Sequence, residues 1–333
     1  MDPFFIVVII VIFAMAFDFT NGMNDAANAI ATVITTRVLS PRVAVIFGAV
    51  LNFIGAFCFQ EVAKTLSKGI FHPSLLTPST LLATVIAAPI WILWCTLKGL
   101  PISCSHSLMG ALIGAGAASA GISKIETAGI QKIVYGIFAS PIAGFLLAVF
   151  LVVAITRLFH RVRPGTANNV FGKLQILSAG TMAFAHGTGD AQKAMGIVTM
   201  ALMVTGYQST SDSDVRLWVR ILCATMMGLG TGIGGWAVIK TLGSRLAHIK
   251  TYQGFAAETA SAASILFNTH LGIPISTTHS ITGAIMGVGA ARGMRQVRWG
   301  VGRKIVFAWV CTFPVCTLGA ALVLKILRAS GMT

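Results

Sequence analysis

Long apolar runs constrain this chain more than any other feature of its sequence. They cover residues 4–17, 43–58, 81–97, 133–155, 215–239 and 305–327. A membrane-spanning helix needs about 20 mostly apolar residues, so runs of this length predict helices that cross a bilayer. Only 10% of the residues are charged, against about 25% in soluble domains, which argues against a soluble enzyme. The runs do not alternate polar and apolar residues, so they do not predict a membrane β-barrel.

The formal net charge of +15 comes from basic residues that lie between the apolar runs. Basic residues in such positions mark the cytoplasmic loops of membrane proteins, so we expect no nucleic-acid partner. The six cysteines show no metal-ligand spacing, which argues against a zinc site or a disulfide framework. The first apolar run lacks a basic leader and a cleavage site, and we expect it to remain as the first span.

Two motifs occur twice, in the same order. The segment GMNDAANA at 22–29 returns as GTGDAQKA at 187–194. The segment PISCSHSLMGALIGAG at 101–116 returns as PISTTHSITGAIMGVG at 274–289. An internal repeat of this length predicts two tandem halves with one structure each, which we place at 1–165 and 166–333.

Equivalent loops of the two halves carry opposite charge. Arg37 and Arg42 follow the first acidic motif, whereas Asp212 and Asp214 follow its copy. The loop after the first Pro-Ile-Ser motif is poor in charge, whereas five basic residues follow the second copy: Arg292, Arg295, Arg298, Arg303 and Lys304. Equivalent loops therefore lie on opposite sides of the membrane, and the repeats are inverted.

The predicted fold is an all-α polytopic membrane protein with two inverted-topology repeats, whose broken or re-entrant helices meet at mid-membrane. We expect five crossings in each half, at about 3–36, 42–60, 80–98, 100–119, 132–157, 172–204, 216–240, 252–271, 274–291 and 305–327. The first element exceeds the hydrocarbon thickness, so we expect it to break within the polar stretch 18–28. Both termini then lie outside the cytoplasm, as do Lys64 and Lys68, which do not fit the charge rule.

Acidic residues at membrane depth are costly and indicate a functional site. Asp25 and Asp190 occupy equivalent positions, and Asn24 and Asn28 add oxygen ligands suited to Na⁺ or a proton site. Na⁺ at Asn24, Asp25 and Asn28 is the only metal ion we consider. A structural ion pair with Lys193 is the simpler alternative for the two aspartates. Asp18 and Glu258 have no acidic counterpart, and each suits either a site edge or a helix-interface hydrogen bond.

The serine-rich copies each follow a proline and precede a Gly/Ala-rich helix. Ser103 and Ser276 are therefore predicted N-caps, and the helix starts that follow offer free N–H groups to an anion. Two such starts related by inverted symmetry would hold one small oxyanion from two sides. Ordinary capping is the alternative, and His106 and His279 suit either the site or a hydrogen-bonded core. Asn21 is a further secondary candidate.

These four motifs resemble those of the inorganic phosphate transporter (PiT) family, and the resemblance covers essentially the whole chain. It implies a secondary transporter that moves phosphate with H⁺ or Na⁺, on an inverted-repeat fold, often as a homodimer. It further implies substrate-binding and cation-coupling residues, which are Ser103, Cys104, Ser105, Ser276, Thr277, Thr278, Gln192 and Lys193 for the substrate, and Asn24, Asp25, Asn28 and Asp190 for the cation. The chain departs from the family at Gly189, where asparagine is usual, and at Cys104, where serine or threonine is common. Gln192 and Lys193 resemble the proton-coupled bacterial branch.

Our interpretation is a symporter that imports inorganic phosphate with a cation, favouring H⁺, across the cell membrane. We expect no cofactor beyond the coupling ion, H⁺ or Na⁺. A sulfate permease of the same family is the alternative, and an anion channel is a third candidate. A membrane hydrolase using Ser103 or Ser276 with the following histidine fits less well, because a nucleophile has no need of two symmetric copies.

Overall fold

The computed structural model describes residues 2–273 and 275–332, with the side chains of 67–69 left out, so Pro274 of the second Pro-Ile-Ser motif lies outside it. Within these ranges the chain forms helices and one isolated bridge between Ala247 and Val297, and no strand. The helices are α1 (Pro3–Thr35), α2 (Pro41–Gly55), α3 (Glu61–Gly69), α4 (Pro78–Leu97), α5 (Cys104–Ala120), α6 (Thr127–Leu158), α7 (Pro164–Val204), α8 (Leu217–Ile233), α9 (Trp236–Lys240), α10 (Thr251–His270), α11 (Thr277–Ala290) and α12 (Trp299–Ala329). The predicted all-α class is confirmed.

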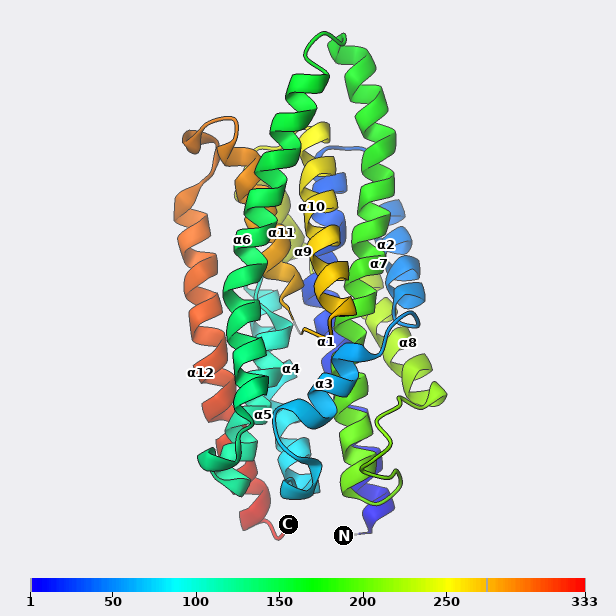
Figure 1. The fold of residues 1–333 in the computed structure, drawn as a ribbon, viewed down its shortest axis with the longest axis vertical. Coiled ribbons are helices and arrows are strands. Elements are labelled where there is room, and N and C mark those ends of the chain that lie inside the picture. The colour runs from blue at the N-terminus through cyan, green and yellow to red at the C-terminus, as the bar shows by residue number, and fades with distance from the viewer. Residues whose placement is uncertain (1, 274, 333) are drawn as a thin grey trace.

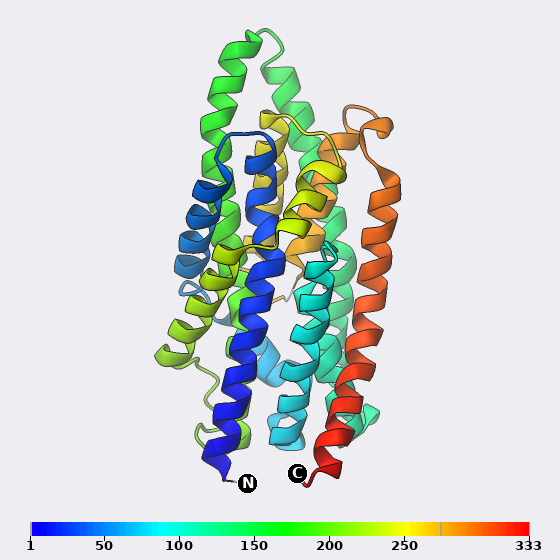
Figure 2. The ribbon, with the colours of Figure 1, turned by 180° about the vertical axis from the view of Figure 1, so that it is seen from behind.

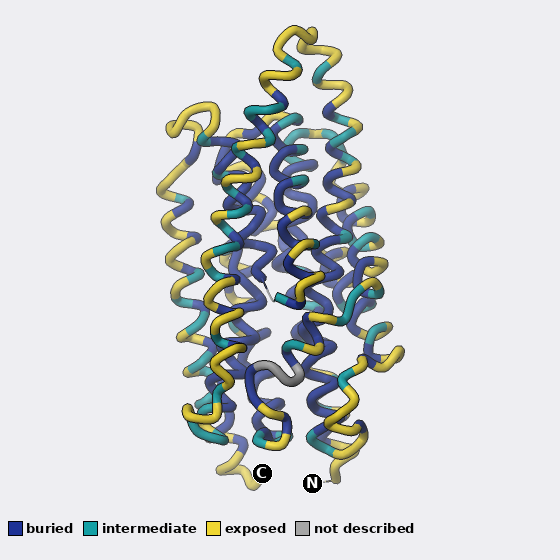
Figure 3. The backbone as a smooth tube through the Cα atoms, viewed as in Figure 1, coloured by how far each residue is buried: buried dark blue, intermediate teal, exposed yellow. Residues whose placement is uncertain are grey.

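Large apolar side chains cover the outer faces of the bundle. Phe138 and Phe150 on α6, and Phe307 and Leu318 on α12, are each more than 60% exposed. Figure 3 shows this exposure along the outside of the bundle, around a buried centre. Exposed apolar area on this scale is typical of a surface that faces lipid.

Four helices are long and apolar enough to span a membrane among the described residues: Pro3–Thr35, Pro78–Leu97, Thr127–Leu158 and Trp299–Ala329. A fifth span arises if α8 and the helical segment Trp236–Arg245, which are bent by 60°, are counted together. The protein is therefore a multi-pass membrane protein.

The prediction of ten separate crossings is wrong for two pairs of helices. α4 and α5 form a hairpin that enters from the end of the molecule where both termini lie, and α10 and α11 form one that enters from the opposite end (Figures 1 and 2). The hairpin tips meet inside the bundle, where the Ser105 hydroxyl donates to the carbonyl oxygen of Ile275 over 3.1 Å. Apolar length alone does not distinguish a crossing from a re-entrant hairpin, whereas the predicted meeting of re-entrant helices is confirmed.

The predicted break of the first span is also wrong, because α1 is continuous over 33 residues. Its polar side chains find partners on other helices: the Asn24 amide donates to Thr96 over 2.8 Å, and Asn28 donates to Thr278 over 3.1 Å. The helix therefore keeps its backbone hydrogen bonds, and its length of about 50 Å extends beyond the hydrocarbon layer.

Glycines in the acidic motifs serve close helix packing. A Cβ on Gly22 would lie 2.4 Å from the carbonyl oxygen of Met227 on α8, and one on Gly187 would lie 2.2 Å from that of Asn52 on α2. The two positions are equivalent in the repeat, so α1 meets α8 as α7 meets α2. Larger residues there would force the helices apart.

The two halves run in opposite directions. α1 rises from the end that holds the termini, whereas α7 descends towards it, and the remaining helices follow in the same order in each half (Figure 1). This is the arrangement of inverted repeats. The boundary between residues 165 and 166 stays a prediction, and it falls at the start of α7.

Lys64, which does not fit the charge rule, has an acidic neighbour from the other half. Its ammonium lies 2.7 Å from a carboxylate oxygen of Asp214. The hydrogen bond from Lys64, together with its positive charge, holds the pKa of Asp214 below its ordinary value. An ion pair offsets the positive charge, so Lys64 adds little to the charge bias of its loop; the side chain of Lys68 lies outside the described residues.

Cysteines introduced at Ser40 and Ser211 should react with a membrane-impermeant thiol reagent from opposite faces. Ser40 precedes α2 at the end away from the termini, and Ser211 lies in the α7–α8 loop at the other end. The labelling is measured in oriented vesicles, with the exposed Cys58 replaced by alanine. Reaction of both positions from one face would contradict the inverted arrangement.

Candidate functional site

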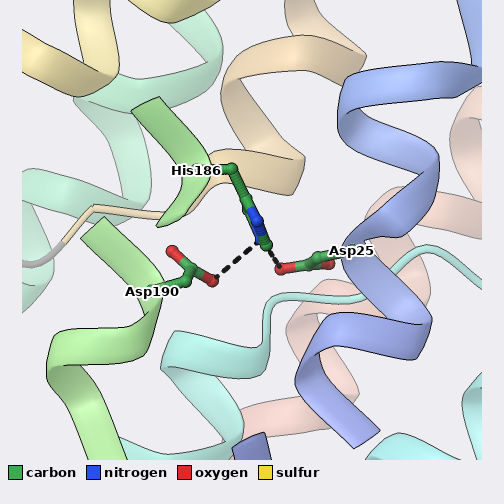
Figure 4. A group of neighbouring side chains, drawn as sticks. All are labelled: Asp25, His186 and Asp190. Carbon is green, nitrogen blue, oxygen red and sulfur yellow. Dashed lines mark ion pairs between the residues drawn. The ribbon is translucent and has the colours of Figure 1, made fainter. Parts of the chain in front are cut away.

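Two carboxylates meet where α1 and α7 pack against each other. His186 lies between them, with its Nε2 atom 3.5 Å from an oxygen of Asp25 and 3.5 Å from an oxygen of Asp190 (Figure 4). With its amide nitrogen turned towards them, Asn21 donates to the same two oxygens over 3.3 Å. The Lys193 ammonium lies 2.6 Å from the other oxygen of Asp190. All five side chains are at most 1% exposed, so the group forms a charged network shielded from solvent.

The orientation of His186 follows from its other ring nitrogen. Nδ1 lies 2.9 Å from the side-chain oxygen of Asn52, whose own amide donates to Thr231 over 2.8 Å. An oxygen accepts only, so Nδ1 carries a proton, an assignment made from the hydrogen-bond network. The proton on Nε2 therefore determines whether the charge of His186 balances the two carboxylates.

Asp25, Asp190 and His186 offer ligand atoms within 4.8 Å of one another, a spacing compatible with a metal ion. Donors from Asn21 and Lys193 already point at the carboxylate oxygens. Since a metal ion needs lone pairs rather than hydrogen atoms, this arrangement suits a proton network better than a metal site.

The start of α11 binds a carboxylate. Thr278 donates its hydroxyl to Asp25 over 2.8 Å, and Thr277 donates to the second oxygen over 3.3 Å. Asn28 donates to both hydroxyls, over 3.1 and 3.2 Å. Ser276 caps the helix by accepting from the backbone N–H of His279. Residues predicted for the substrate and for the cation are thus in direct contact, at the positive end of a helix dipole.

The start of α5 faces α11 from the other hairpin. Ser103 caps it by accepting from the N–H of His106 over 3.1 Å, and Ser105 reaches the other hairpin. Cys104 is fully buried. On this side of the site, the Asn24 amide donates to Thr96, near the end of α4. The side-chain amide oxygens of Asn24 and Asn28 have no hydrogen-bond partner among the described residues, and both remain candidate cation ligands.

His106 and His279 pack against each other behind the helix starts. Their rings lie 4.7 Å apart, and that of His279 stacks on Trp309 at 3.7 Å. Both line the floor of a groove of about 690 Å³ whose other walls are apolar side chains of α6, α11 and α12. The two rings thus pack in the core, but neither ring nitrogen of His279 has a hydrogen-bond partner among the described residues, so the alternative of a hydrogen-bonded core does not describe His279.

The side chain of Gln192 does not point to the starts of α5 and α11. Its side-chain oxygen accepts from the N–H groups of Val62 and Ala63, and its nitrogen donates to the carbonyl oxygen of Thr188. The side chain therefore caps α3, and the prediction that it binds substrate does not match this orientation. Gly189, three residues earlier, faces Thr269 of α10, where a Cβ would lie 3.2 Å from the hydroxyl oxygen.

Glu258 lies outside the charged network, in a separate buried cluster. Its carboxylate accepts from Thr32, Ser178 and Gln175, which come from α1 and α7. The hydrogen-bond alternative for Glu258 fits this environment, because neutral donors satisfy both of its oxygens.

Sequence reasoning missed His186, Asn52, Thr231 and Thr96. A signal existed for His186, since it occupies in the second motif the place that Asn21 holds in the first. The other three lie outside the motifs, and their contacts come from helices far apart in sequence. Only the packed structure brings them to the network.

A model of the phosphate transporter family matches residues 21–167 and 159–320. The chain belongs to this family. A probable low-affinity inorganic phosphate transporter of Bacillus subtilis is 43% identical over 316 residues, which cover 94% of this chain and 95% of that protein. One of Rhizobium meliloti is 45% identical over 310 residues, covering 93% and 92%. A solved structure of a sodium-dependent phosphate transporter matches with a TM-score of 0.90 and 26% identity, covering 97% of this chain and 99% of the other.

Membership of the phosphate transporter family confirms the predicted resemblance. The matched relatives are named transporters, so this member is a transporter rather than an enzyme, and the hydrolase interpretation is set aside. The paired serines and histidines then need no nucleophilic role.

Replacing Lys193 with methionine should destabilise the protein by about 3–5 kcal/mol, because it leaves the Asp190 carboxylate buried without its cation. The double variant Lys193→Met with Asp190→Asn should recover most of the loss. Thermal unfolding in detergent measures both.

Lys64→Met is the matched control, since it removes an exposed ion pair and should leave the unfolding temperature close to that of the wild type. Equal effects of the two lysine substitutions would contradict a special role of the buried pair.

Proposed function

We propose that this protein is a secondary transporter that imports inorganic phosphate together with a proton across the cell membrane. The observation that carries the proposal is the contact between Asp25 and the start of α11, where Thr277 and Thr278 donate to a carboxylate. A phosphate oxygen presents the same acceptor chemistry to these hydroxyls and to the free N–H groups of the first turn. The names of the relatives support phosphate as the substrate.

Substrate and coupling ion share residues in this arrangement. A phosphate that takes the threonine hydroxyls removes two donors from Asp25 and brings its own negative charge close. Asp25 then keeps Asn21 and His186 as neighbours but has lost two donors, so its charge at membrane depth is costly unless a cation or a proton arrives at the same time. Binding of phosphate and uptake of a positive charge are thereby linked.

A proton suits this network better than Na⁺ as the coupling cation. The Lys193 ammonium is paired with Asp190, so a positive charge already stands where a cation would be needed. Asn28 donates to the threonines, and the side-chain oxygens of Asn24 and Asn28 are the two unpaired amide oxygens that α1 offers a cation among the described residues. The solved relative is named sodium-dependent, so the identity of the coupling ion requires a direct test.

Phosphate is favoured over sulfate by the carboxylates. Dibasic phosphate carries a hydroxyl that donates to a carboxylate, whereas sulfate carries none and meets only repulsion. Mismatched buried polar groups cost on the order of 1–3 kcal/mol each, which corresponds to about a 5- to 150-fold preference. A sulfate permease is the second candidate, and a channel is disfavoured because the network is buried.

Uptake of radiolabelled phosphate into proteoliposomes should rise as the external pH falls, collapse with a protonophore, and be indifferent to Na⁺. Sulfate in tenfold excess should compete weakly. Strong Na⁺-dependent uptake that resists the protonophore would contradict proton coupling, and equal competition by sulfate would contradict the choice of anion.

Thr278→Val should weaken phosphate affinity by about tenfold, because it removes one buried hydroxyl donor worth about 1.5 kcal/mol. The affinity is measured as the concentration for half-maximal uptake. Thr282→Val is the matched control: it makes the same change one turn later on α11, at a hydroxyl without a partner among the described residues. Normal affinity in Thr278→Val, or equal loss in both variants, would contradict this placement of the anion.

The proposal includes a homodimer in the cytoplasmic membrane, which the resemblance to the family suggests. Light scattering of the purified protein in detergent tests it, and a mass of one chain after subtraction of detergent would contradict it.

A further inference from the structure

Asp18 is a buried acid that the mechanism above does not use. It lies on α1, two turns before Asp25, and its side chain is 0% exposed. Neither of its carboxylate oxygens accepts a hydrogen bond from an N–H or O–H group within the described part of the chain; the group that faces it is a thiol, a weak donor, on Cys223 of α8. The other two acids at this depth on α1 and α7, Asp25 and Asp190, are each surrounded by several donors.

From the antiparallel packing of α1 and α7 we infer that Asp18 lies near the level of Lys193. Asp25 pairs with His186, and one turn lower Asn21 pairs with Asp190. Each step of three or four residues along one helix matches an equal step back along the other. The next step down pairs Asp18 with Lys193. The lysine side chain instead reaches back one turn to Asp190, at 2.6 Å.

The titratable groups that bear on Asp18 come from two helices. The Cys223 thiol faces it from α8, and His186, Asp190 and Lys193 act on it from α7. Among these, Lys193 carries its charge on a four-carbon stem with several rotatable bonds, so its ammonium can reach more than one partner. An ionised Asp18 in this position would lack both water and a paired cation, which is far more costly than a neutral acid.

We propose that Asp18 is a proton-binding residue of the transport cycle, neutral in this conformation, and that Lys193 is its alternate partner. When the Asp18 O–H bond breaks and the proton passes to water, the carboxylate attracts the Lys193 ammonium away from Asp190. The total charge of the side chains falls by the one proton released, and Asp190 keeps His186 as its neighbour. The proposal rests on proton-coupled phosphate transport and names the residue that carries the proton.

The contacts among these side chains link a movement of Lys193 to the proposed phosphate site. Movement of Lys193 changes the charge that acts on Asp190 and, through Asn21 and His186, on Asp25. Asp25 contacts the threonines at the start of α11. One displaced ammonium thus alters the electrostatic environment of the proposed phosphate site from about two helical turns away.

The decisive variant is Asp18→Asn, which copies the shape of the neutral acid. We expect phosphate exchange between equal concentrations to stay within twofold of the wild type, since exchange requires no net proton movement. Uptake driven by a pH gradient should fall at least tenfold, and Asp18→Glu should restore part of it. Thr20→Val is the control, because the hydrogen bonds that Thr20 makes to the described residues go to its own helix backbone, at Ala16 and Phe17, and the change should leave both assays unaltered.

A second measurement does not depend on transport. Infrared difference spectra between acidic and alkaline pH should show the carbonyl band of a protonated carboxylic acid, and this band should be lost in Asp18→Asn. Undiminished pH-driven uptake in Asp18→Asn, loss of exchange in a correctly inserted Asp18→Asn protein, or an unchanged acid band would each overturn the proposal. If wild-type uptake instead follows Na⁺ alone, the proposed coupling fails, and the infrared band still decides whether Asp18 binds a proton.

Discussion

The burial of two carboxylates between α1 and α7 is the constraint on which the rest of this structure depends. A lone carboxylate at membrane depth would be neutralised or excluded, so Asp25 and Asp190 require compensation from their neighbours. Lys193 and His186 supply it from α7, and Asn21 supplies it from α1. The requirement for so many donors around two residues brings α1, α7 and the start of α11 together at one place.

Close approach of the helices makes that meeting possible. Gly22 and Gly187 allow α1 and α7 to contact α8 and α2 with backbone against backbone. Each hairpin then ends inside the bundle, so the helix starts at Ser103 and Ser276 face each other rather than solvent. An ordinary crossing helix would place its positive end in the headgroup region, where water would weaken its effect on an anion.

The repeated motifs predict much of the fold and of the site. The remaining contacts depend on how each helix is rotated about its axis and packed against its neighbours. Equivalent aspartates and equivalent serine-rich starts predicted helices meeting at mid-membrane, and membership of the phosphate transporter family agrees with that prediction. The unbroken α1 was not predictable, because polar residues within an apolar run suit either a break or partners on other helices. Gln192 and Lys193 are adjacent in the motif, yet a turn of about 100° sends one to α3 and the other to Asp190. Asp190 lies four residues after His186 on α7, a spacing that the sequence shows, whereas Asn52 and Asp25 come from α2 and α1, and no spacing reveals them.

The two halves share a scaffold but differ in charge, and this difference bears on coupling. Asn21 on α1 corresponds to His186 on α7, Asn28 corresponds to Lys193, and Asp18 corresponds to Ala183. Equivalent helices with matching glycine contacts let the halves exchange conformations at similar cost, as alternating access requires. A copy of the α1 residues on α7, in contrast, would give the network four acids with no cation. Placing the basic groups on α7 and the extra acid on α1 keeps the network compensated while leaving one acid without a fixed partner. A symmetric fold with asymmetric charges is thus compatible with the proton-coupled transport proposed above.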